Sequence, residues 1–168
     1  MRILQSSGRS PGFTLIELLV VLAVLAILVT IAIPSFQNII RDNRVTAQSN
    51  ELTALISYAR SQASQGASRI RLTIDRAGNS WSLIIEDLDC SPSPPCILRA
   101  ADNRNVLMDS NDAPFPIQMQ FNSRGILATG QLGLSLQHDP CSGPRQRREL
   151  DVLVSGNVRS RHAGCQGG

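Results

Sequence analysis

FTLIELLVVLAVLAILVTIAI, residues 13–33, is the strongly apolar run of this 168-residue chain, and Glu17 is the only charged residue in it. As an α-helix, the run would rise about 1.5 Å per residue and span roughly 31 Å, enough to cross the hydrocarbon core of a bilayer. Arg2 and Arg9 precede it without an acidic residue. Because positive charge tends to stay cytoplasmic, the sequence predicts a single-pass helix whose C-terminal side lies outside the inner membrane.

The composition of the chain limits its class. Over all residues, 42% are hydrophobic and 17% are charged, and the mean hydropathy is −0.01. A single apolar run excludes a polytopic membrane protein. The Ile, Leu and Val content of the remainder excludes a fully disordered chain.

Two simpler interpretations of the apolar run fit less well. A secretory signal peptide has a shorter apolar region and a small-residue cleavage site after it, whereas Ile33-Pro34-Ser35-Phe36 is a poor exit site. A plain signal anchor does not explain Glu17. A carboxylate in an apolar span costs about 2.5 kcal/mol or more, so it indicates a function.

The hexapeptide GFTLIE, residues 12–17, resembles the cleavage and methylation motif of type IV pilins and type II secretion pseudopilins. The resemblance implies that a prepilin peptidase cuts after Gly12 and methylates Phe13, which leaves 156 of the 168 residues. It also implies that Glu17 pairs with the N-terminal ammonium of a neighbouring subunit. Pro34 corresponds to a family proline that kinks or locally melts the helix.

Helical periodicity resumes after Pro34. Five apolar residues at spacings i, i+3, i+4, i+7 and i+11 form one stripe of an amphipathic helix that would run from about Phe13 to Gln65, with Gly66 as its stop. We expect the stripe to pack in the core; it consists of Leu52, Leu55, Ile56, Ala59 and Ala63.

From Arg69 onward, alternating polar and apolar residues predict strands instead. Residues 69–75 and 80–86 should form a hairpin around a turn at 77–79, and residues 88–96 form a Pro- and Ser-rich loop. A long helix followed by many short strands predicts an α+β fold. Further strands are expected near residues 97–100, 105–108, 116–121, 131–137, 149–155 and 158–161.

Residues 44–63 are similar to the helix of the GspH/FimT/FimU branch of minor pilins and pseudopilins, as are the turn at 121–125 and the segment 152–159. The resemblance implies a type IV pilin-like fold, in which a long N-terminal helix packs on a mainly antiparallel sheet. The expected divisions are a cleaved leader (1–12), a transmembrane or filament-core half-helix (13–35) and an extracytoplasmic globular domain (36–168).

This resemblance implies a minor pilin of the type IV pilus, a non-catalytic subunit of pilus assembly or of the tip complex. The alternative is a GspH-like pseudopilin of a type II secretion system. The expected partners are the prepilin peptidase, other pilins or pseudopilins and the inner membrane, with DNA as a further hypothesis. We expect no catalytic site and no cofactor, because the sequence contains no phosphate-binding loop and no recognisable set of catalytic residues.

The four cysteines lie in the part predicted to be exported, where disulfides persist. Three pairings are open. We favour Cys90–Cys96, which closes a small Pro-rich loop, and Cys141–Cys165, which ties back the C-terminus. The competing interpretation is a zinc site in which His138 and His162 join Cys141 and Cys165 as four tetrahedral ligands.

Charge is unevenly distributed along the chain. Residues 75–112 carry seven acids and three Arg, whereas residues 140–168 carry five Arg and two acids. Three of these Arg are expected in a loop and two on one face of a strand, where they could grip phosphates. DNA-binding members of the FimT-like branch carry a Gly-Arg-x-Arg element, and here Gly156-Asn157-Val158-Arg159 lacks its first Arg. The candidate DNA-binding residues are Arg145, Arg147, Arg148, Arg159 and Arg161.

Overall fold

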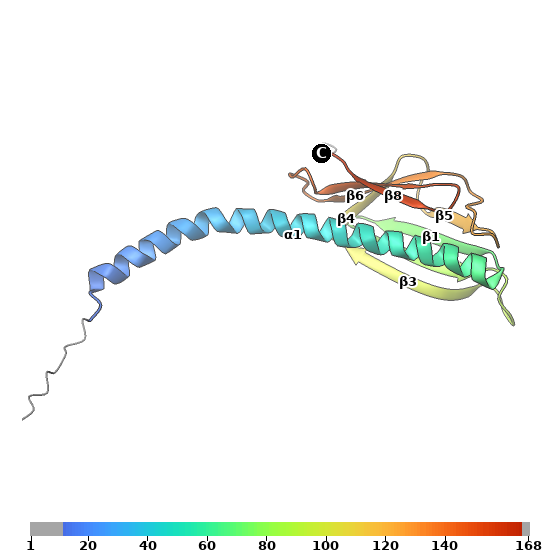
Figure 1. The fold of residues 1–168 in the computed structure, drawn as a ribbon, viewed down its shortest axis with the longest axis horizontal. Helices are drawn as coiled ribbons and strands as arrows, with labels where there is room; N and C mark the ends of the chain where they lie inside the picture. The colour runs from blue at the N-terminus through green and yellow to red at the C-terminus, as the bar shows by residue number, and fades with distance from the viewer. Residues whose placement is uncertain (1–11, 166–168) are drawn as a thin grey trace, which may run out of the picture. The chain divides into compact units, whose positions relative to one another are not determined.

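A computed structural model describes residues 12–165 (Figure 1). The described part holds one long helix followed by eight strands. In chain order they are α1 (Leu15–Gly66), β1 (Ile70–Ala77), β2 (Ser80–Asp87), β3 (Cys96–Arg104), β4 (Val106–Ser110), β5 (Ile117–Phe121), β6 (Leu132–His138), β7 (Arg147–Val152) and β8 (Val158–His162). The fold is α+β, as predicted.

The chain divides into two compact units, with the boundary between Gln37 and Asn38 inside α1. The first unit contains the apolar half of α1. The second contains the rest of α1 and every strand. Position 34 lies within α1, which continues without a break from Leu15 to Gly66, so the local melt, one of the two effects that the resemblance implied, is not seen.

The strands form two antiparallel sheets of four strands each, in the orders β3-β2-β1-β5 and β4-β6-β7-β8. An isolated bridge between Phe121 and Leu127 adds to the first sheet. The amide of Leu127 also donates to the carbonyl of Val154, which follows β7. Residue 127 therefore connects the first sheet to the turn that follows β7.

The core of the second unit lies between α1 and the inward faces of both sheets (Figure 1). All five residues of the predicted helical stripe are buried, which confirms the helical period. Trp81 is only 1% exposed, and its indole N–H donates to Oε1 of buried Gln48 at 3.1 Å. Burial of this polar group is therefore offset by a hydrogen bond.

Strand positions follow the predicted alternation, with three differences. The strand expected at 149–155 ends at Val152, so Val154 lies in a turn and is exposed. β3 extends to Arg104, beyond the expected end at residue 100. β7 begins at Arg147, so Arg147 and Arg148 lie in a strand and not in the loop where the sequence analysis placed them. The sequence predicted that this strand begins at Glu149, because residues 145–148 show no alternation of polar and apolar side chains.

Candidate functional site

The start of α1 is a reciprocal capping box. Thr14 precedes the helix, and its hydroxyl accepts from the amide of Glu17 at 3.3 Å. The Glu17 carboxylate in return accepts from the Thr14 amide at 3.0 Å and from its hydroxyl at 2.9 Å. These bonds satisfy donors that a helix end leaves free. Thr14 is not among the residues predicted for the site, although its Thr-x-x-Glu spacing is a sequence signal for such a cap.

Apolar side chains of the first unit are exposed on every side of α1. An 18-residue window in α1 has a mean hydropathy of 3.1, and none of its residues is buried. A surface of this size is unstable in water and needs a membrane or neighbouring helices. Length and composition suffice for a membrane span.

The structure joins Cys90 to Cys96 and Cys141 to Cys165, which is the pairing favoured from the sequence. All four cysteine sulfurs are thereby used. The alternative zinc interpretation is wrong for this structure, because Cys141 and Cys165 hold each other and not a metal. Within residues 12–165, no three His, Cys, Asp or Glu side chains are grouped so that they could hold a metal ion.

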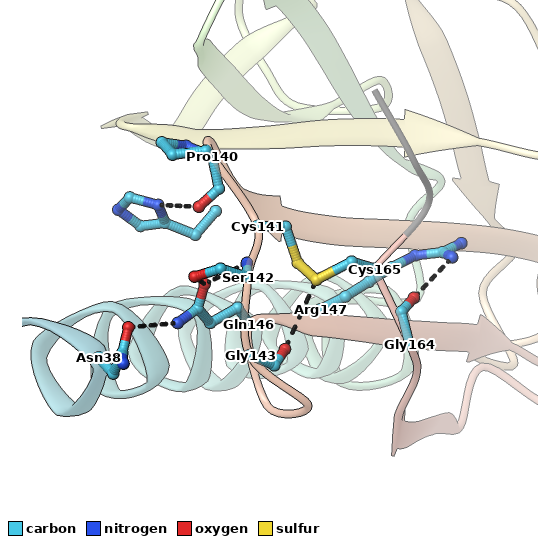
Figure 2. The surroundings of a disulfide bond; sticks show 10 residues. Asn38, Pro140, Cys141, Ser142, Gly143, Gln146, Arg147, Gly164 and Cys165 are labelled. Atoms are coloured by element: carbon cyan, nitrogen blue, oxygen red, sulfur yellow. Dashed lines mark hydrogen bonds between the residues drawn. A yellow bond between two sulfur atoms is a disulfide. The ribbon is translucent and has the colours of Figure 1, made fainter. Parts of the chain in front are cut away.

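The loop that contains Cys141 is fixed to α1 by Gln146 (Figure 2). Gln146 is completely buried. Its side-chain oxygen accepts from the amide of Ser142 at 2.9 Å, and its side-chain nitrogen donates to Oδ1 of Asn38 on α1 at 3.5 Å. The disulfide then attaches the C-terminal segment at Cys165 to the same loop.

The five candidate DNA-binding arginines do not form one patch. Successive residues of a strand point to opposite faces, so Arg148 shares the inward face of β7 with buried Leu150, whereas Arg147 lies on the other face. Arg159 and Arg161 share that other face, opposite Asp151 and Glu149 in register. Arg145 stays in the loop before β7.

Two of these arginines are held by acids. Arg147 is only 6% exposed; it pairs with Glu149 at 3.1 Å and donates to the carbonyl of Gly164. Arg161 pairs with Glu149 at 2.8 Å and with Asp151 at 3.2 Å. The hydrogen bond to Glu149, with the charges of both acids, raises the pKa of Arg161. Arg147 and Arg161 are therefore engaged by acids within the domain, and the five arginines do not form the single cluster expected from the sequence.

Comparison with known proteins assigns the family. The model of the family described as "Type II transport protein GspH" matches residues 48–157, and the "Prokaryotic N-terminal methylation motif" matches residues 8–33. The chain belongs to the GspH family. Its capping box and exposed apolar helix thus lie in the methylation motif, and strands β1 to β7 lie within the GspH match, which ends just before β8.

Solved structures show the same fold. The type IV minor pilin FimU of Pseudomonas aeruginosa superposes with a TM-score of 0.54 at 20% identity, over 69% of this chain and 91% of that one. A second crystal form of FimU gives a TM-score of 0.56 at 19% identity, over 71% and 89%.

Curated relatives match over a short segment. A fimbrial protein of P. aeruginosa is 44% identical over 55 residues, which are 33% of this chain and 36% of that protein. The type IV major alpha-pilin of Moraxella bovis is 49% identical over 47 residues, 28% and 30% of the two chains. The chain therefore spans about a third of the length of these relatives.

Proposed function

We propose that this protein is a minor pilin of the type IV pilus, a structural subunit without catalytic function. A prepilin peptidase removes residues 1–12 and methylates Phe13. The chain is then held in the inner membrane as a single-pass protein, with residues 36–168 outside, until other pilins take it into the filament at or near its tip. Glu17 and Pro34 serve this assembly step.

One observation carries the proposal: an entirely exposed apolar helix, capped at Glu17, is covalently joined to a folded GspH-family domain. A helix of this kind is stable in a bilayer before assembly. It is also stable among like helices after assembly, because both environments bury its apolar surface.

The second candidate is a pseudopilin of a type II secretion system, favoured by the description of the matching family. Two observations favour the pilus: the chain shares its fold with FimU, and its curated relatives are pilus proteins. Deletion of the gene in its native host separates the two candidates. We expect loss of surface pili with secretion intact; loss of secretion with pili intact would instead identify the pseudopilin.

DNA uptake is a separate hypothesis. We base it on Arg145, Arg148 and Arg159, because these three candidate arginines have no carboxylate partner among the described residues. A DNA shift assay over a salt series tests it, because each lost phosphate contact flattens the salt dependence. Changing these three to Ala should weaken binding if DNA is a ligand. Equal, weak binding by the wild type and the variant would reject DNA as a ligand.

A further inference from the structure

A polar hollow of about 380 Å³ lies between α1, the loop before β7, and strands β7 and β8. It belongs entirely to the second unit, and Ile39 forms an apolar part of its lining. Its polar lining consists of Asp42, Asn43, Thr46, Arg145, Arg148 and His162.

The positive charge of the hollow has no carboxylate partner within residues 12–165. The terminal nitrogens of Arg148 contact the hydroxyl of Ser160 and Nε2 of His162, both at 3.2 Å. Its Nε is enclosed and without a hydrogen-bond partner. Arg145 is exposed at the edge of the hollow. An anion in the hollow would therefore meet two guanidinium groups with donors to spare.

The hollow also carries an uncompensated negative charge. Asp42 is half-buried, and its Oδ1 is enclosed without any hydrogen bond. It lines the same hollow as Arg148, but the two do not approach within ion-pair distance. A carboxylate and a guanidinium that line one hollow without pairing fit a ligand that has both an ammonium and an anionic group.

We propose that this hollow binds the zwitterionic headgroup of an aminophospholipid, a phosphoethanolamine group. The phosphate lies against Arg145 and Arg148, and the ammonium lies toward Asp42. Hydroxyl and amide groups of Thr46 and Asn43 complete the polar lining. No covalent step is involved.

A lipid is the favoured occupant because of where the hollow is tethered. Its first lining residue, Ile39, follows the end of the apolar run by six residues. These six residues belong to α1 and rise roughly 9 Å as a helix, so the chain places Ile39 within a short distance of the headgroups of the membrane that holds the helix. This step rests on the proposed membrane anchoring.

Full-length protein in nanodiscs tests the proposal. The discs contain phosphatidylethanolamine, phosphatidylcholine or phosphatidylglycerol with identical acyl chains, and native mass spectrometry counts the lipids that stay bound after release. Choline has no N–H to donate to Asp42, and glycerol has no cation. We expect retention of the ethanolamine lipid about tenfold above either of the others.

Two variants assign the contacts. Asp42→Asn should abolish the preference for ethanolamine over choline, whereas Arg148→Gln with Arg145→Gln should lower retention of all three lipids. Asp102→Asn, and Arg104→Gln combined with Arg124→Gln, make the same charge changes at exposed sites away from the hollow and should leave retention unchanged. Soluble phosphoethanolamine, added in excess, should displace the lipid if the headgroup alone is recognised.

Every other result overturns the proposal, and each points to a different cause. Equal retention of the three lipids by wild type rejects the headgroup site and leaves the anchoring intact. Failure to enter nanodiscs of any composition rejects the anchoring as well. A photoreactive residue at Asn43 that crosslinks to another pilin in cells, and not to lipid, would make the hollow a protein interface.

Discussion

Glu17 is satisfied within its own chain by Thr14, so its hydrogen bonds and its charge need separate tests. Glu17→Gln keeps a side-chain oxygen that can accept from the Thr14 amide but removes the charge that would attract a neighbour's ammonium. We expect its incorporation into filaments to fall about tenfold or more, as for loss of one charge-assisted contact. Immunoblots of sheared filaments against whole cells measure this.

Thr14→Ser is the matched control for Glu17, because it retains a capping hydroxyl and the charge. It should be incorporated like the wild type. Normal incorporation of Glu17→Gln would show that the carboxylate acts only as a helix cap and has no role between subunits.

His138 makes the stability of the second unit dependent on pH. Burial, together with the charges of Arg41 and Arg44 on α1, lowers its pKa, although the Pro140 carbonyl and Asp139 act in the opposite direction. The folded protein therefore binds this proton less readily than the unfolded chain, whose histidines titrate near pH 6.5. Stability is fully present above pH 6.5 and is lost as pH falls below it, until the lowered pKa of the folded state is reached.

We expect the loss to be at most about 1.4 kcal/mol per pH unit for this one group. Urea unfolding between pH 8 and pH 5 measures it, and His138→Gln should flatten the curve below pH 6.5. An unchanged slope in that variant would assign the acid sensitivity to other groups.

Among the elements, two turns close against the same side chain of α1. Gly125 and Gly156 both adopt positive φ, 71° and 78°, and both lie against Arg60. The guanidinium of Arg60 also donates to Oδ1 of Asn157 at 2.6 Å. A Cβ at Gly156 would lie 2.7 Å from Arg60 Cδ and 2.8 Å from the Gly125 carbonyl oxygen, so this position has no room for a side chain.

Gly156→Ala should therefore destabilise the domain by about 2 kcal/mol or more, through backbone strain plus the clash. Gly130→Ala is the control, since Gly130 has φ 90° but open space around it. Denaturant unfolding of both variants should show the larger loss for Gly156. Equal losses would mean that strain alone acts and that the contact with Arg60 is unimportant.

Local patterns predicted the elements well where apolar spacing was regular. The helical stripe around Leu52 and the alternation in residues 69–75 reflect side chains that enter the core, so their periods are visible in the sequence. The start of β7 was missed because Arg147 is buried by an ion pair and a carbonyl contact, not by apolar packing. Nothing in the residue types distinguishes that arginine from an exposed one.

For the whole molecule, pairing between distant segments was beyond the sequence. The two-sheet arrangement and the division of the arginines between two faces depend on the register of β7 with β8. The hollow likewise brings Asp42 of α1 and Arg148 of β7 into one lining, and these two residues are far apart in the sequence. The cysteine pairing was accessible because few combinations exist and the exported context favours disulfides.

The two disulfides should differ in their contribution to stability. Cys141 and Cys165 are separated by 24 residues and Cys90 and Cys96 by six. On the chain-entropy model these loops correspond to about 3 and about 2 kcal/mol of stabilisation. Replacing each pair by Ser and comparing denaturant midpoints tests this order; a larger loss from the Cys90–Cys96 pair would contradict it.

Processing of the N-terminus tests the central claim most directly. Protein purified from its native host should give, by mass spectrometry, a chain that begins at Phe13 and carries one added methyl group on its terminal amine. A mature chain that retains residues 1–12, or one cut after the apolar run, would contradict the assignment of this helix to pilin assembly.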